Sequence, residues 1–114
     1  MSNPSGAKGT AWETKIERLL QEAGYDATRI VKRGAEDHGD VEIRLPVGRI
    51  TVEAKNERKY TLNEYVEEAS KESENAGTMF GVAWVHRARK ASPADGYVVM
   101  SGAQFIEILR ILSS

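Results

Sequence analysis

The chain has 114 residues, 40% of them hydrophobic, which is enough for one domain with a modest core. Lysine and arginine number 16 against 17 aspartates and glutamates, so the net charge of −1 excludes a protein that binds nucleic acid through bulk positive charge. Without cysteine there is no disulfide framework, and no apolar run is long enough to span a bilayer, so we expect a cytoplasmic protein with no membrane partner.

The N-terminal quarter predicts an arm followed by a helix. Residues 1–8 are polar and rich in Gly, Pro and Ser, which indicates a flexible arm, and residues 9–114 then form a single domain. Apolar residues recur at helical spacing from Trp12 onward until Gly24 ends the pattern. This spacing predicts a helix over 10–23.

An antiparallel hairpin is predicted next, after a strand near 27–31 and a polar loop over 32–39. Apolar and polar residues alternate over 40–45, which predicts a strand with one buried face. The turn residues 46–48 return the chain as a second strand over 49–55.

The second half predicts a helix, two strands and a last helix. The segment 61–76 lacks Pro and Gly and has glutamates opposite its apolar side, and Gly77 is its expected C-cap. The apolar run 80–85 indicates an inner strand covered on both faces, and 97–100 indicates another. An amphipathic helix over 101–112 closes the chain. The expected fold is an α/β sandwich with a central mixed sheet, in the order α-β-β-β-α-β-β-α.

The hairpin carries acids and a lysine at one end. Glu53 and Lys55 share the face of their strand that lies opposite Val52. Asp40 begins the preceding strand, so the antiparallel return brings it to the same end as Glu53. Two such carboxylates bind a hard divalent cation, and a neighbouring lysine orients or activates water and stabilises an oxyanion. The pattern indicates phosphodiester hydrolysis, whereas Glu53 and Lys55 alone are also typical of a surface ion pair.

Glu13 has two interpretations. Thr10-Ala-Trp-Glu13 has the form of a capping box, in which both side chains satisfy the first amides of a helix. On a helical wheel, however, Glu13 lies about 20° beyond Leu20 on the flank of the apolar stripe, where it also points inward over the sheet edge. The sequence leaves both interpretations open.

The order of these residues resembles the archaeal-type Holliday junction resolvases of the PD-(D/E)XK nuclease superfamily. The resemblance covers about residues 8–105 and implies a restriction-endonuclease-like fold. The proline that gives the superfamily its name is replaced here by Gly39. In chain order, the resemblance rests on Lys8 to Glu13, Leu19, Leu20, Gly24, Tyr25, Arg29, Asp40 and Glu53 to Lys55.

The resemblance implies a role for each residue of the site. Asp40, Glu53 and the backbone carbonyl of Ala54 would hold Mg²⁺, with Mn²⁺ as a substitute. Glu13 would complete the acidic cluster, directly or through water. Lys55 would position or activate the attacking water, and Arg29 would hold the scissile phosphate. The expected DNA contacts are Lys8, Thr10, Arg29, Lys32, Arg33, Arg58 and Lys59.

The expected function is therefore a Mg²⁺-dependent endonuclease that cuts branched DNA, above all four-way junctions, by paired nicks. A homodimer matches the two-fold symmetry of such a junction. Its interface is expected at the C-terminal helix, which is more apolar than one packed face requires, or at the strand 80–85. The alternatives are another nuclease of the superfamily acting on linear duplex or flap DNA, and a non-catalytic DNA-binding relative.

Overall fold

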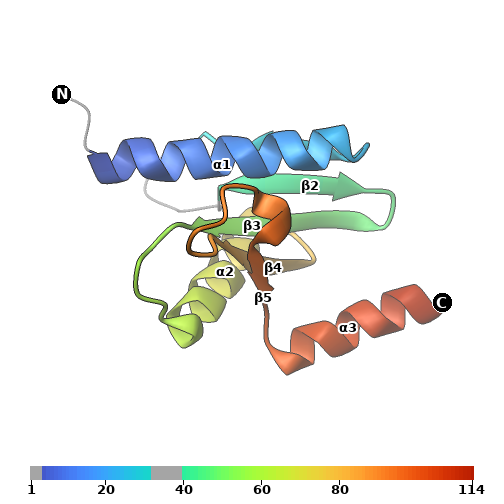
Figure 1. Cartoon of the computed structure of the whole chain (residues 1–114). Coiled ribbons are helices and arrows are strands. Elements are labelled where there is room, and N and C mark those ends of the chain that lie inside the picture. The colour runs from blue at the N-terminus through green and yellow to red at the C-terminus, as the bar shows by residue number, and fades with distance from the viewer. Residues whose placement is uncertain (1–3, 32–39) are drawn as a thin grey trace.

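The computed structural model describes residues 4–31 and 40–114 (Figure 1). Within these residues, the chain forms a five-stranded mixed sheet and three α-helices, which confirms the predicted α/β class. In chain order the elements are α1 Pro4–Glu22, β1 Asp26–Arg29, β2 Val41–Leu45, β3 Gly48–Lys55, α2 Leu62–Ala76, β4 Phe80–Val85, the short 3₁₀ helix η1 Pro93–Asp95, β5 Tyr97–Val99 and α3 Gly102–Ser113.

The strands lie side by side in the order β1-β2-β3-β4-β5. β2 and β3 form the predicted antiparallel hairpin, with Val41 opposite Val52. β3 then pairs in parallel with β4, and α2 provides the crossover that a parallel pair needs. The C-terminal ends of β3 and β4 therefore meet at one edge of the sheet, where the backbone amide of His86 donates to the Lys55 carbonyl at 2.8 Å.

Helices cover both faces of the sheet (Figure 1). On one face, Trp12 and Ile16 of α1 pack in a core cluster with Val52 of β3. On the other face, Tyr65 of α2 packs against Ala83 and Val85 of β4. Because side chains alternate along a strand, Thr51, Glu53 and Lys55 lie on the face opposite Val52, as predicted, and α2 covers this face.

α2 approaches β4 unusually closely at Gly81. A Cβ atom added to Gly81 would lie 2.1 Å from the carbonyl oxygen of Ala69, so any side chain there would force the helix away from the sheet. Glu68 and Glu72 flank this point of contact along the helix. Because Gly81 has no side chain, α2 packs close to the sheet, and Glu68 and Glu72 come near Glu53 of β3.

The observed start of the first helix differs from the prediction. α1 begins at Pro4, so part of the segment assigned to an arm is helical and Thr10 lies inside the helix. The Thr10 carbonyl accepts a hydrogen bond from the Thr14 hydroxyl at 3.0 Å, as an interior residue does. The capping-box interpretation of Glu13 is therefore wrong. The other helices begin and end close to their predicted bounds, and Gly77 caps α2 with a left-handed φ of 67°.

Candidate functional site

Asp40 lies immediately before β2 and is tied to β3 by its backbone and its side chain. Its amide donates to the Val52 carbonyl at 3.0 Å, and its Oδ2 accepts a hydrogen bond from the Ala54 amide at 2.8 Å. These bonds fix the Asp40 carboxylate at the C-terminal end of β3. Asp40 and Glu53 therefore lie at the same end of the hairpin, as the antiparallel geometry predicted.

Glu53 is buried and contacts two other acids, Asp40 and Glu72. It is only 7% exposed, and its Oε2 has no hydrogen-bond partner among residues 4–31 and 40–114. Burial is the largest influence on its pKa, followed by the hydrogen bond with Glu72 and the charge of Asp40, and together they raise the pKa of Glu53 to about 11. Without a cation, Glu53 therefore holds a proton at neutral pH.

Glu13 reaches the same acids from α1. Burial, a hydrogen bond with Asp40 and the charge of Asp40 raise the pKa of Glu13 to about 8, although Arg29 acts in the opposite direction. Arg29 Nη2 lies 3.4 Å from Glu13 Oε2, and the Arg29 amide donates to Glu17 Oε2 at 2.7 Å. α1 therefore places Glu13 in the cluster and holds a partly exposed arginine at its edge.

The ammonium group of Lys55 lies between two glutamates. Its Nζ is 2.5 Å from Glu68 Oε2 and 3.7 Å from Glu53 Oε1, and it lies 5.3 Å from the centre of the Tyr65 ring. Burial lowers the pKa of Lys55, but the hydrogen bond to Glu68 and the negative charge of neighbouring glutamates outweigh burial and raise it. Lys55 is therefore a cation at neutral pH and stabilises negative charge.

Glu68 and Glu72 of α2 belong to the site, although the sequence pattern placed the glutamates of this helix on its outer side. Glu72 is 5% exposed and faces Glu53. One carboxylate oxygen from each of Glu53, Glu68 and Glu72 lies within 4.8 Å of the others. Helical spacing contained a signal for Glu72, because it follows Ala69 by one turn and Tyr65 by two on the buried face.

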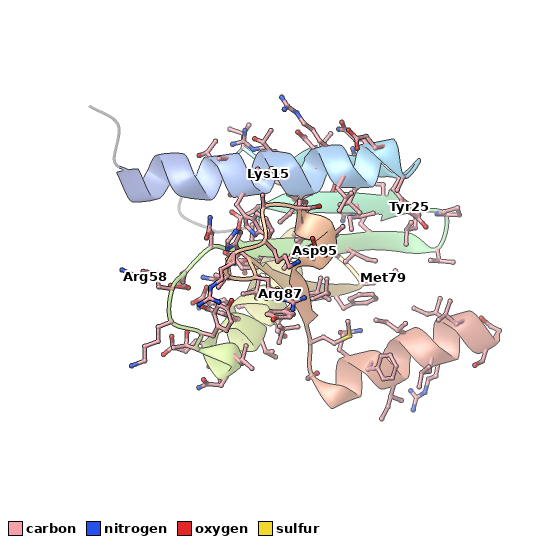
Figure 2. The ribbon with its side chains drawn as sticks, in the orientation of Figure 1. Lys15, Tyr25, Arg58, Met79, Arg87 and Asp95 are labelled. Atoms are coloured by element: carbon pink, nitrogen blue, oxygen red, sulfur yellow. The ribbon has the colours of Figure 1, made fainter. Side chains whose placement is uncertain are left out.

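Two basic loops leave the same edge of the sheet. Arg58 and Lys59 follow β3, and a basic run that includes Arg87 follows β4; these side chains are exposed. The Tyr60 hydroxyl donates to the His86 carbonyl at 2.8 Å, which ties the two loops together. Figure 2 labels Arg58 and Arg87 on these loops. Positive charge therefore adjoins the acidic site.

Of the other residues expected to contact DNA, the structure describes the side chains of some and not of others. Thr10 is exposed on α1 and Arg29 is exposed beside Glu13. The side chain of Lys8, and Lys32 and Arg33 altogether, lie outside the described residues.

A comparison of the chain with protein-family models gives no match, and a search among curated proteins gives none either. The resemblance to junction resolvases thus rests on the residues of this sequence and their order alone. None of the helices in the described part of the chain combines the length and the apolar character needed to cross a membrane.

Proposed function

We propose that this protein is a Mg²⁺-dependent endonuclease that hydrolyses phosphodiester bonds in branched DNA and resolves four-way junctions by paired nicks. The observation that carries the proposal is the convergence of Asp40, Glu53 and Lys55 at one end of the β2–β3 hairpin, with Glu13 added from α1. Carboxylate and carbonyl oxygens are the ligands that Mg²⁺ and Mn²⁺ prefer. A buried Glu53 oxygen that lacks a hydrogen-bond partner among the described residues fits a group that binds a cation.

The residues divide the work of hydrolysis. Asp40, Glu53 and the Ala54 carbonyl would hold Mg²⁺, and Glu13 would bind it directly or through water. When bound, the metal supplies an activated water and neutralises charge on the reacting phosphate. Lys55 carries a proton, so it orients the water or stabilises the phosphate oxygens and does not act as a general base. Arg29 would hold the scissile phosphate with its guanidinium.

DNA as the partner is supported by where the positive charge lies. Although the chain has a net charge of −1, the loops after β3 and β4 expose cations at the edge that carries Lys55. Such groups contact the phosphate backbone and position a duplex without reading its sequence. The exposed basic side chains on these loops are Arg58, Lys59, Arg87, Arg89 and Lys90.

The homodimer is supported by α3. This helix is apolar on several sides, yet every one of its residues is exposed or only half-buried. Together with the sheet it lines an apolar groove of about 290 Å³ that includes Ile50, Trp84 and Ile108. β4, the other candidate for the interface, lies inside the sheet with its side chains packed on both faces. We therefore assign the dimer interface to α3. A monomer by light scattering at micromolar concentration would contradict the dimer.

Cleavage of a synthetic four-way junction with Mg²⁺ tests the proposal, with flap and linear duplex DNA as competing substrates. We expect paired nicks in the junction, and a loss of rate of at least about 100-fold in Asp40→Asn and Lys55→Ala with DNA binding retained. Lys71→Ala, which removes an exposed lysine from α2, is the matched control and should cleave normally. Faster cleavage of flap or duplex would favour another nuclease of the superfamily. Unchanged cleavage by Asp40→Asn would refute the assignment.

A further inference from the structure

Two glutamates of α2 approach Glu53, which also contacts Asp40. Glu53 comes from β3, whereas Glu68 and Glu72 lie one helical turn apart on α2. One carboxylate oxygen of each lies within 4.8 Å of the other two. The close approach of α2 at Gly81, where even a Cβ atom would clash, holds this spacing. The packing of the fold therefore keeps together the parts of β3 and α2 from which the three carboxylates extend, although the Glu68 side chain itself is exposed.

Glu53 also has a buried oxygen without a hydrogen-bond partner among the described residues, which fits a group that binds a cation. Glu53 is more than nine-tenths buried, and its Oε2 is without a hydrogen-bond partner in the part of the chain that the structure describes. Glu72 is as deeply buried. Buried carboxylates persist in proteins when they are paired with a cation, coordinate a metal or hold a proton. A ligand with several positive charges would satisfy more than one of these groups at once.

Lys55 neutralises part of the negative charge of this cluster. Its Nζ contacts Glu68 closely but lies 3.7 Å from the nearest Glu53 oxygen. The ammonium group thus faces two of the three glutamates of the cluster. The ligand chemistry of the cluster is all oxygen, which suits a hard divalent cation such as Mg²⁺, Mn²⁺ or Ca²⁺.

We propose that Glu53, Glu68 and Glu72 form a second divalent-cation site, which shares Glu53 with the site at Asp40 and releases Lys55 from Glu68 when a cation binds. A cation in this position carries twice the charge of the ammonium group and takes over Glu68 as a ligand. Lys55 then loses its contact with Glu68 of α2, and its ammonium group becomes available at the end of β3. This last consequence rests on the proposed nuclease function, because it makes Lys55 available to water or phosphate; the cation site itself does not.

Calorimetric titration of the whole protein with Mn²⁺ tests the proposal without any DNA. We expect two Mn²⁺ per wild-type chain and one fewer in the double variant Glu68→Gln/Glu72→Gln. The matched control is Glu67→Gln/Glu74→Gln, which removes two exposed glutamates from the same helix and should bind as the wild type does. Asp40→Asn should retain the Mn²⁺ that the α2 variant loses. Circular dichroism establishes that each variant is folded, and the single variant Glu72→Gln serves if the double variant is not.

The outcome of this titration separates the two proposals. If the α2 variant binds as many Mn²⁺ as its control, the second site is refuted, whatever the nuclease assay shows. If the α2 variant loses one Mn²⁺ while Asp40→Asn loses none, the second site stands and the proposed ligand role of Asp40 fails. The release of Lys55 has its own readout, because a Ca²⁺ titration followed by NMR should shift the side-chain amine signal of Lys55 in the wild type and leave it unchanged in Glu68→Gln/Glu72→Gln.

Discussion

Replacing Glu53 by glutamine should make the metal-free protein more stable above neutral pH, although the change removes a proposed ligand. Burial, the hydrogen bond with Glu72 and the charge of Asp40 raise the pKa of Glu53 from 4.5 to about 11. Between these two values the folded chain keeps a proton that the unfolded chain releases. The free energy of unfolding of the wild type therefore falls as the pH rises through this window. Glutamine resembles the protonated acid in shape and has no proton to lose.

The size of the effect follows from the width of the window. From 4.5 to an assay pH of 8 the change is about 3.5 units, and at about 1.4 kcal/mol per unit this corresponds to about 5 kcal/mol. Glutamine makes the hydrogen bonds of the carboxyl group less well, which offsets about 1 to 2 kcal/mol. We therefore expect Glu53→Gln to be more stable than the wild type by about 3 kcal/mol at pH 8 and no more stable at pH 5.

Urea unfolding in EDTA, followed through the fluorescence of Trp12 and Trp84, measures this difference between pH 5 and pH 8. Glu67→Gln, an exposed change on α2, is the control and should follow the wild type at every pH. Excess Mn²⁺ should stabilise the wild type and leave Glu53→Gln nearly unaffected, which reverses their order. A wild type that is more stable than Glu53→Gln in EDTA at pH 8, or a difference that does not change with pH, would refute the reasoning.

Three further outcomes are expected. Gly81→Ala should lower the free energy of unfolding by about 3 kcal/mol in urea, because its Cβ would clash with an α2 carbonyl, whereas Gly102→Ala, with open space around it, should change it by less than about 1 kcal/mol. Trp12→Phe should cost about 1 to 3 kcal/mol in the same assay, because it removes the 3.1 Å hydrogen bond from the indole to the Trp84 carbonyl. In fluorescence anisotropy, Arg58→Ala should reduce the salt dependence of junction binding by about one unit of log–log slope, and an unchanged slope would place DNA elsewhere.

The hairpin and its acids could be predicted because their signals are local. Alternation assigns Val52 and Glu53 to opposite faces whatever surrounds the strand. The turn is equally local, since Gly48 has a φ of 150°, which favours glycine. Once the hairpin is antiparallel, Asp40 must lie near the end of β3, and its bond to the Ala54 amide is the result. The alternation of side chains and the antiparallel return of the hairpin were therefore enough to predict that Asp40 and Glu53 lie close together.

The start of α1 was misread because one motif has two meanings. Thr10-Ala-Trp-Glu13 has the spacing of a capping box, but the same letters also occur inside helices. Pro4, at the first helical position, was the better signal, since a proline there loses no helical hydrogen bond. The other interpretation, in which Glu13 points inward over the sheet edge, agrees with its position beside Asp40.

The part played by α2 could not be read from apolar periodicity. A search that counts only hydrophobic residues finds Tyr65 and Ala69 and leaves out the glutamates, whatever their spacing. Glu72 nevertheless lies on the same side, and its neighbour across the interface, Glu53, is distant in sequence. What places them together is the fit of α2 against Gly81, which depends on the whole fold.

Among the described residues, the acids around Glu53 outnumber the cations that contact them, and the backbone that carries them is held in place. Asp40 is anchored to the backbone of β3, and α2 cannot retreat without losing its contact at Gly81. In the metal-free chain, the repulsion is relieved by a proton on Glu53, whose pKa burial and the neighbouring acids raise, and by the contact of Lys55 with Glu68. A sequence selected for stability alone would replace such acids by amides or apolar groups. The cation binding that we propose would convert the same repulsion into affinity.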